Sequence, residues 1–348
     1  MLTSQAIKNE ARYLGFTLAG ITSPAPPLHL SAYENWLRLG RHGSMEYLAN
    51  ERARTCRRDP RLILAECRSI LILGVRYPDP KTVLLNEKAG PSGRVAAYAW
   101  GRDYHLVLSQ RLEALATFID QEAGERLPQR WYTDTGPILE RDLAQRAGLG
   151  WIGKNTCLIN PKLGSYFLLA EILLGADLEP DLSFTTDRCG TCTRCIEACP
   201  THCILPDRTL DARRCIAYLT IENKGEIPSD LCPQIGNWIF GCDVCQMVCP
   251  WNRFATKEYD QSFTPYPSLP NPDLIAELTL TPQGFNRKFK DSPVQRARRG
   301  GYLRNTAIAL GNSRNMAGIP ALEGAMQDDS PLIRKHAGWA LEKIRKNE

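Results

Sequence analysis

The cysteine run at residues 189–200 constrains this chain more than any other stretch. It reads Cys189-Gly-Thr-Cys192-Thr-Arg-Cys195-Ile-Glu-Ala-Cys199-Pro200. The C-x2-C-x2-C-x3-C-P spacing is typical of bacterial-type ferredoxins, in which three thiolates hold one [4Fe-4S] cluster and the fourth points toward a second cluster. One such run therefore predicts a partner run and two clusters.

The partner run lies downstream and reads Cys242-Asp-Val-Cys245-Gln-Met-Val-Cys249-Pro250, without the first cysteine of the pattern. The crossover rule predicts one cluster on Cys189, Cys192, Cys195 and Cys249, and a second on Cys199, Cys242 and Cys245. The candidates for the missing ligand are Cys203, Cys215 and Cys232, and we choose Cys215. The alternative is two zinc sites, but these are built from paired C-x2-C knuckles rather than a triple run that ends in Cys-Pro.

The chain around these runs divides into three predicted domains. Helical patterns at 4–15, 104–122 and 138–147 alternate with strand patterns at 16–21, 69–75, 131–134, 157–160 and 165–174, and the last two can form a hairpin. Residues 1–183 are therefore expected to form a mixed α/β (α+β) domain, and residues 184–258 the ferredoxin-like module. Residues 79–93 are expected to be a loop.

Beyond the module, only helical periodicity remains. Residues 259–272 contain four prolines and are expected to be a linker. Apolar stripes then follow at Leu303, Ala307 and Leu310, at Ile319, Leu322 and Met326, and at Ile333, Ala337, Ala340 and Ile344. Such short helices resemble a HEAT-type repeat, which predicts an all-α domain over 259–348.

The cysteines and the apolar runs indicate a reducing compartment. The chain has 13 cysteines in 348 residues, and those outside the clusters are scattered singly, as in a cytoplasmic protein. Cys56, Cys67 and Cys157 are most simply buried apolar residues. The N-terminus shows no signal peptide, and no apolar run reaches the roughly 18 residues of a membrane helix, so no membrane association is expected.

Basic residues gather between 286 and 304. This stretch has a net charge of +6, while the rest of the chain is close to −1. Its members are Arg287, Lys288, Lys290, Arg296, Arg298, Arg299 and Arg304, opposed by Asp291 alone. The concentration favours a polyanionic partner, and a solvated basic face is the alternative.

Asp134 is the candidate for proton chemistry. It follows the strand pattern at 131–134 and precedes a Gly-Pro turn that leads into a helical pattern. An acid at this position can be a general acid if burial raises its pKa, or it can be a helix cap. Lys154 and Asn155 follow a glycine-rich loop and could contact a large ligand.

Motifs over nearly the whole chain resemble those of the epoxyqueuosine reductases. They are His42-Gly43-Ser-Met45-Glu-Tyr47, Asp134-Thr-Gly-Pro-Ile-Leu-Glu-Arg141, Gly148-Leu-Gly-Trp-Ile-Gly-Lys-Asn155, Arg214-Cys215-Ile-Ala-Tyr-Leu-Thr-Ile-Glu222 and the two cysteine runs through Asn252. The resemblance implies a cobalamin-binding α/β domain, two [4Fe-4S] clusters and a helical C-terminal domain that helps to hold tRNA. It also supports Cys215 as the missing cluster ligand.

The implied reaction removes the epoxide oxygen of epoxyqueuosine at the wobble position of tRNA and gives queuosine, the last step of queuosine biosynthesis. By the resemblance, Asp134 is catalytic, and the expected cobalamin contacts are Tyr98, Tyr104, Asp134, Arg141, Gly153, Lys154 and Asn155. The implied partners are tRNAs for Tyr, His, Asn and Asp, contacted by the basic residues between 287 and 304, and an electron donor such as a flavodoxin or ferredoxin. A cytoplasmic monomer is expected.

The chemistry of this reaction agrees with the motifs. Turning an epoxide into an alkene takes two electrons and two protons, so one-electron clusters must supply a centre such as cobalamin. A base-off cobalamin is expected, because Asp103-Tyr-His105 begins a lower-ligand histidine motif but Leu108 stands where that motif needs glycine. Asp134 as proton donor would need a carboxylic acid kept neutral near pH 7 by an apolar pocket.

Two other functions remain as alternatives. A cobalamin-dependent dehalogenase of small molecules would leave the basic stretch without a role, and respiratory dehalogenases have an export signal. A ferredoxin-type electron carrier would leave the large α/β domain without a ligand.

Overall fold

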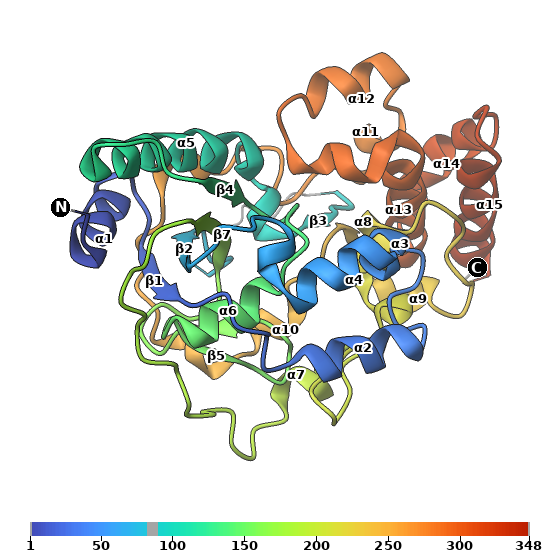
Figure 1. Ribbon diagram of the computed structural model, residues 1–348. Coiled ribbons are helices and arrows are strands. Elements are labelled where there is room, and N and C mark those ends of the chain that lie inside the picture. The colour runs from blue at the N-terminus through green and yellow to red at the C-terminus, as the bar shows by residue number, and fades with distance from the viewer. Residues whose placement is uncertain (1, 82–89, 347–348) are drawn as a thin grey trace.

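A four-stranded antiparallel sheet is the centre of the first part of the chain (Figure 1). The computed structural model describes residues 2–81 and 90–346, so most of the loop expected at 79–93 lies outside the described residues. The strand order is β1 (Leu18–Thr22), β2 (Ser69–Arg76), β7 (Phe167–Leu174), β4 (Gln129–Tyr132). Every neighbouring pair is antiparallel, which makes this mixed α/β region an α+β arrangement.

Helices cover both faces of this sheet, because alternate residues of a strand point to opposite faces. On one face, Leu71 and Leu73 of β2 belong to the same core as α1 (Ser4–Tyr13) and α5 (Tyr104–Ala123). On the other face, Ile70 and Ile72 belong to a second core with α6 (Glu140–Arg146). The two cores fix the end of β4, from which the Asp134 turn leads to α6.

The predicted hairpin between 157–160 and 165–174 is wrong. The strand β6 (Leu158–Ile159) pairs with β5 (Trp151–Ile152), while β7 lies between β2 and β4 in the main sheet. The physical reason is burial: β7 is mostly apolar and is covered on both faces, as expected of a central strand.

Short helices flank this region. They are α2 (Leu30–Arg38), α3 (Glu46–Ala49), α4 (Glu51–Arg58) and the 3-10 turns η1 (Pro60–Leu62) and η2 (Ala97–Ala99). The loop before α3 contacts the cysteine-rich segment, since the Ser44 amide donates a 2.8 Å hydrogen bond to the Tyr218 hydroxyl. A Cβ on Gly43 would lie 2.5 Å from that hydroxyl, so this close approach requires glycine.

The cysteine-rich segment is made of short elements. They are α7 (Arg194–Glu197), η3 (Ala212–Arg214), α8 (Ile216–Ile221), α9 (Cys232–Ile235), β8 (Trp238–Phe240), α10 (Val244–Met247) and η4 (Pro250–Arg253). The strand β8 pairs in parallel with β3 (Arg94–Val95), so backbone hydrogen bonds join this segment to the first part of the chain. The boundary at 183/184 stays a prediction, and contacts cross it.

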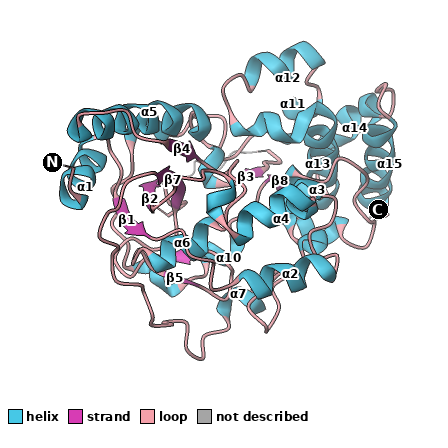
Figure 2. Ribbon diagram, in the orientation of Figure 1, coloured by secondary structure: helices cyan, strands magenta, loops and turns pink. Residues whose placement is uncertain are grey.

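The C-terminal part is helical in the described residues through 346 (Figure 2). The three apolar stripes are confirmed as α13 (Arg298–Ser313), α14 (Ile319–Ala325) and α15 (Pro331–Arg345). The sequence did not predict α11 (Leu274–Leu278) and α12 (Pro282–Lys288), and 3-10 turns lie at Gln261–Phe263, Pro293–Ala297 and Met316–Gly318.

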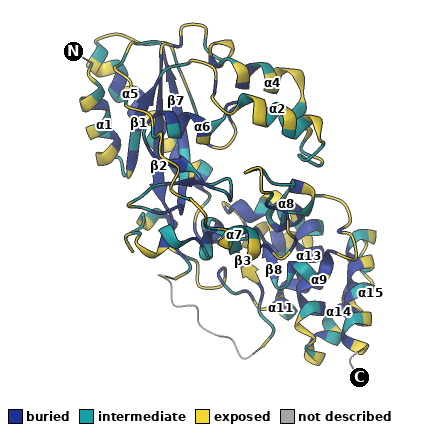
Figure 3. Cartoon of the chain, turned by 90° about the horizontal axis from the view of Figure 1, so that it is seen from below, coloured by how far each residue is buried: buried dark blue, intermediate teal, exposed yellow. Residues whose placement is uncertain are grey.

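The linker at 259–272 is fastened to the first part of the chain. Arg111 of α5 donates two hydrogen bonds to Asp260, at 2.6 and 3.0 Å. Figure 3 shows buried residues continuing from β2 and β7 toward α13. No described helix combines the length and the apolar character needed to cross a membrane.

Candidate active site

Asp134 lies in the turn between β4 and α6, with a backbone φ of 61°. Aspartate tolerates this left-handed conformation better than most residues. Its amide donates a 2.9 Å hydrogen bond to Oε1 of Glu140, the first residue of α6. The N-cap position of α6 is Leu139, so Asp134 is not a helix cap.

Two side chains of α5 hold the Asp134 carboxylate. The Tyr104 hydroxyl donates to Oδ2 at 2.8 Å, and Nε2 of His105 lies 3.8 Å from the same oxygen. The other ring nitrogen of His105 contacts Asp103 at 2.8 Å, and the ring stacks on Tyr104 with centroids 4.1 Å apart. The start of α5 thus positions Tyr104 and His105 beside the Asp134 carboxylate.

The charge states differ from the expectation of a neutral acid. Burial raises the pKa of Asp134, but the nearby His105, the hydrogen bond from Tyr104 and the charge of Arg141 outweigh it, so the pKa is lowered. The Asp134 side chain itself is 64% exposed. Burial lowers the pKa of His105, but the hydrogen bond to Asp103 and the nearby Asp134 carboxylate outweigh that and raise the pKa to about 9. With these shifts, Asp134 is an aspartate and His105 an imidazolium at neutral pH.

A buried carboxyl pair lies beneath the Asp134 turn. Glu171 of β7 is fully buried, neither of its carboxyl oxygens has a hydrogen-bond partner in the described structure, and Glu140 lies within electrostatic reach. Two neighbouring carboxyl groups in a buried site do not both ionise, because each negative charge raises the pKa of the other. Burial, followed by the charge of Asp134, raises the pKa of Glu140 to about 7. Burial and the charge of Glu140 raise the pKa of Glu171 well above its ordinary value, so Glu171 is the protonated partner at neutral pH.

The expected cobalamin contacts divide into two groups. Tyr98 packs on Tyr104 with ring centroids 6.1 Å apart, and Arg141 is exposed within electrostatic reach of Asp134. Asn155 is buried, with a side-chain Nδ2 that has no hydrogen-bond partner in the described structure. Lys154 differs from this group, because its ammonium donates to the carbonyls of Gly190 and Cys192 at 2.7 and 2.9 Å. Lys154 therefore binds the loop that contains Gly190 and Cys192 rather than an open ligand site.

Gly153 precedes these residues in a crowded turn. A Cβ there would lie 2.5 Å from Cδ1 of Ile159 and 2.7 Å from Oδ1 of Asn155. The structure therefore gives Gly153 a packing role, and a contact with cobalamin stays a prediction.

The first cysteine set comes together at the edge of the molecule. Cys195 lies within electrostatic reach of Cys189 and Cys192, and Cys249 within reach of Cys189 and Cys195. The Trp151 indole lies 3.5 Å from the sulfur of Cys189. The structure thus brings together the four residues predicted for the first cluster.

The second set also comes together. Cys242 lies within electrostatic reach of Cys215 and Cys199, and Cys245 within reach of Cys242 and Cys215. Cys203 is also near, with its sulfur 3.4 Å from that of Cys199. Cys215 is nevertheless the better candidate for the fourth ligand, because it reaches Cys199, Cys242 and Cys245.

Cys232 lies elsewhere. It packs among apolar residues that include Ile216 and Ile235, and its thiol points to the Ile227 carbonyl at 3.7 Å. Cys232 is therefore removed from the candidates for the second cluster.

Cys157 has a neighbour that the sequence did not predict. Cys56 and Cys67 are buried as expected, but Cys157 is only partly buried and its side chain hydrogen-bonds Cys245. Arg141 lies within electrostatic reach of Cys157 as well as of Asp134. These contacts connect the second cysteine set to the Asp134 turn, and nothing in the spacing of Cys157 indicates them.

The comparisons with known proteins agree with this site. Residues 57–135 match a family model described as epoxyqueuosine reductase QueG, DUF1730, and residues 188–252 match one described as a 4Fe-4S double cluster binding domain. An epoxyqueuosine reductase of Pseudomonas aeruginosa is 40% identical over 342 residues, which cover 97% of this chain and 93% of that protein. The chain belongs to the epoxyqueuosine reductase family.

Solved structures of epoxyqueuosine reductases show the same fold. One, with an epoxyqueuosine-modified stem loop of a tyrosine tRNA, is 30% identical with a TM-score of 0.87, covering 98% of this chain and 89% of that one. Another, from Bacillus subtilis and with its catalytic aspartate loop swung out of the active site, is 30% identical with a TM-score of 0.85, covering 98% and 90%. This reductase is accordingly an oxidoreductase with a segment for two iron–sulfur clusters, and the match to a 4Fe-4S model favours clusters over zinc.

The residues of the basic stretch of the reductase differ in whether a described carboxylate pairs with them. Arg287, Lys290 and Arg298 are exposed, and no described carboxylate pairs with them. Lys288 pairs with Glu277, and Arg299 pairs with Asp328 at 2.5 Å. Arg287, Lys290 and Arg298 are therefore the members best placed to meet phosphate.

Arg304 is the clear correction to the predicted tRNA contacts. It is fully buried, and its guanidinium donates to the carbonyls of Leu219, Asn223 and Gly225. A side chain without exposed surface cannot contact RNA. Arg304 instead fastens α13 to the segment that follows α8.

Arg296 lies near the active site. It donates two 2.9 Å hydrogen bonds to Glu222, and its guanidinium lies over the Tyr47 ring at 5.7 Å. The charge of Asp134 is one of the influences that raise the pKa of Tyr47, after burial and the charge of Glu222. The start of the helical C-terminal part thus flanks the Asp134 site.

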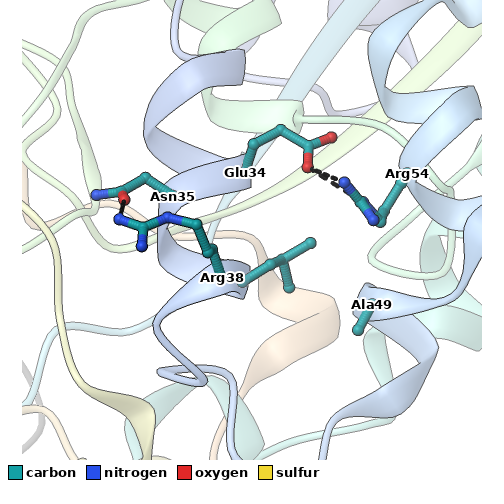
Figure 4. A pocket seen from close by; sticks show the side chains of 6 residues that line it. Glu34, Asn35, Arg38, Ala49 and Arg54 are labelled. Carbon is teal, nitrogen blue, oxygen red and sulfur yellow. Dashed lines mark hydrogen bonds and ion pairs between the residues drawn. The ribbon is translucent and has the colours of Figure 1, made fainter.

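A separate hollow between α2 and the α3–α4 pair holds none of these residues (Figure 4). Arg54 and Glu34 pair there at 2.5 Å, and Arg38 donates to Asn35 at 2.7 Å. Because it contains none of the candidate catalytic or cluster residues, this hollow is not a candidate for the chemistry.

Proposed function

We propose that this reductase removes the epoxide oxygen of epoxyqueuosine in a tRNA anticodon at the Asp134 site, with cobalamin bound there and two [4Fe-4S] clusters as its electron source. The observation that carries the proposal is the junction of Asp134, Arg141, Cys157 and Cys245. These residues support the proposal because Arg141 lies within electrostatic reach of both Asp134 and Cys157, and Cys157 within that of Cys245.

The cluster assignment follows from the two cysteine sets. Cys189, Cys192, Cys195 and Cys249 hold the first cluster, and Cys199, Cys215, Cys242 and Cys245 hold the second. The second lies on the side of Asp134, because Cys245 contacts Cys157 and Tyr98 packs on Phe240, two residues before Cys242. Electrons therefore pass from the first cluster to the second and then to the substrate site.

The residues around Asp134 fit a large amide-bearing cofactor such as cobalamin. The unpaired Nδ2 of Asn155 is a buried donor that a side-chain amide of the corrin could satisfy. Tyr98, Tyr104 and Arg141 surround Asp134 and would hold the cofactor there, in the base-off form. When bound, cobalamin supplies a reduced cobalt centre for attack on the substrate.

Proton delivery uses the chain's own residues. A bound nucleoside excludes water from Asp134, which raises the pKa of its carboxyl group. The His105 imidazolium, 3.8 Å away, can then pass its proton to Asp134 and on to the departing oxygen. Asp103 holds the other ring nitrogen and keeps His105 oriented.

The RNA is held by exposed cations of the helical part, which we assign to a HEAT-like domain. Arg287, Lys290 and Arg298 supply phosphate contacts. The solved relative with a tRNA stem loop supports this class of substrate.

The decisive experiment is single-turnover reduction of an epoxyqueuosine-containing stem-loop by Asp134→Asn protein with both cofactors verified as loaded. Asparagine has the same size but cannot carry the proton, so the rate should drop by roughly 10²- to 10⁴-fold while cobalamin and RNA binding persist. A rate near that of the unchanged protein would remove Asp134 from the mechanism.

A further inference from the structure

The first cysteine set borders a hollow on the surface of the molecule. Cys249 lines this hollow together with Lys81, Arg194 and Arg253. Arg188 lies close by, with its guanidinium 5.9 Å from the Trp251 ring. We call Lys81, Arg188, Arg194 and Arg253 the cluster face.

The cations of the cluster face are not neutralised. In the part of the chain that the structure describes, none of the four pairs with a carboxylate, whereas Lys288, Arg296 and Arg299 all do. The nearest acid in the hollow is Glu197, which accepts a hydrogen bond from Thr193. Four thiolates make a [4Fe-4S] cluster an anion, so these cations offset a charge that would otherwise repel an acidic protein.

Apolar surface lies within the same face. Phe254, next to Arg253, is 72% exposed, and Trp251 packs edge-on against Trp151 with centroids 5.0 Å apart. An exposed aromatic residue among arginines is the composition of a transient protein interface. The cluster face therefore combines charge, apolar contact and a cluster ligand in one place.

We propose that the cluster face is the docking surface for an acidic one-electron carrier protein of the flavodoxin or ferredoxin class. The proposal rests on the proposed function, which needs an external reductant. In each encounter, one electron leaves the carrier's reduced flavin or cluster and enters the first cluster of the reductase. Two such transfers, with two protons, convert one epoxide into an alkene and release its oxygen as water.

An acidic carrier fits this face better than RNA. The hollow contains the cluster ligand Cys249, and electron transfer needs a short path between donor and cluster. The second cysteine set, by contrast, is the one connected to Asp134. The carrier and the nucleoside thus have separate entrances, and a carrier can bind while tRNA is in place.

The test compares two electron sources for the same holo-protein. The double variant Arg194→Glu with Arg253→Glu is assayed with a purified reduced flavodoxin and with reduced methyl viologen, after iron content and cluster spectra are matched. With flavodoxin, kcat/KM should fall by at least roughly tenfold and lose much of its salt dependence. With methyl viologen, the rate should be unchanged, because a small cation needs no docking face.

The matched control is Arg126→Glu with Arg130→Glu, two exposed cations that follow α5 and lie outside the cluster face. This variant should keep the flavodoxin-driven rate. Calorimetric binding of oxidised flavodoxin should weaken only in the cluster-face variant, a readout independent of turnover.

Three results would overturn the proposal: an unchanged flavodoxin-driven rate, an equal loss with both reductants, or weakened binding of the tRNA stem-loop in place of flavodoxin. Absence of epoxide reduction by the unaltered protein with methyl viologen would instead contradict the proposed function.

Discussion

At the scale of single residues, the candidate active site is a group of neighbouring titratable side chains rather than one acid in an apolar pocket. Tyr104 and His105 lower the pKa of Asp134, and we propose that His105 stores a proton for the reaction. This arrangement explains how an exposed aspartate can take part in acid chemistry. The proton is stored next to it and moves when a bound substrate excludes water.

His105 gives a pH prediction. Its imidazolium exists below its pKa of about 9 and is lost above it, so the single-turnover rate should fall as pH rises through that value. His105→Gln should lack this decline and should be roughly 10- to 10²-fold slower at neutral pH, because glutamine stores no proton. The groups that face His105 are Asp103, Asp134 and Tyr104.

A matched control for His105 is His29→Gln. His29 also contacts a carboxylate, Asp142 at 2.6 Å, but does not touch Asp134. It should keep both the rate and the pH profile. The same decline in the His105 variant would mean that another group titrates.

Glu171 gives a stability prediction. The folded-state pKa of Glu140 is raised from 4.5 to about 7, so the folded protein binds more protons than the unfolded chain in that interval. Stability contributed by this pair is therefore lost as pH rises through about 7. Glu171→Gln removes a buried carboxyl group whose pKa is raised in the folded protein, and should reduce that dependence.

The measurement is the Tm of holo-protein from about pH 5 to about pH 8. The decrease in Tm should be smaller in Glu171→Gln than in the unchanged protein, whereas Glu113→Gln, an exposed site on α5, should show no difference. Equal slopes would show that Glu171 does not contribute to the pH dependence of stability.

At the scale of elements, short loops rather than long helices set the positions of the cluster ligands. The ammonium of Lys154 ties the β5–β6 turn to the loop of Cys192, and Trp151 of β5 reaches Cys189. The small hairpin therefore supports the first cluster. The glycines around Trp151 have the spacing of a dinucleotide-binding loop, but such a loop follows a strand and opens a helix. Here the segment forms β5 and the turn that follows it.

Cys215 is tested by cluster content. Reconstituted protein should contain about eight irons, as two cubanes require, and Cys215→Ser should retain about four by losing only the second cluster. Cys203→Ser is the matched control, because Cys203 is buried beside Cys199 but reaches fewer of the other ligands. Loss of iron from the Cys203 variant alone would reverse the assignment.

At the scale of the whole molecule, three consecutive stretches of chain form one continuous structure. The strand pair β3–β8, the Arg111–Asp260 pair and the buried Arg304 each join parts far apart in sequence. This continuity brings the start of the helical C-terminal part to the Asp134 site, through Arg296 and Tyr47.

The RNA surface gives a prediction at this scale. Replacing Arg287 and Arg298 by alanine should flatten the dependence of log affinity on log salt by roughly one unit each, because each phosphate contact releases a counterion. Arg314→Ala, an exposed arginine just after α13, should leave the slope unchanged. A normal slope in the Arg287 and Arg298 variants would make this stretch a solvated face.

The sequence by itself determined the features that depend on local spacing. The cysteine runs predicted two cluster-binding sets, and the apolar stripes predicted α13, α14 and α15, because thiolate spacing and helical period are properties of neighbouring residues. The motif around Asp134 also identified the catalytic candidate.

Only the tertiary structure decided features that depend on residues far apart in the chain. It separated Cys215 from Cys232, buried Arg304, paired Glu140 with Glu171, and brought His105 to Asp134. A pKa and an exposed surface are set by every neighbour in space, which the spacing of one segment does not specify. For the same reason the sequence predicted Asp134 at the end of a strand but did not predict that His105 and Tyr104 lower the pKa of its carboxyl group.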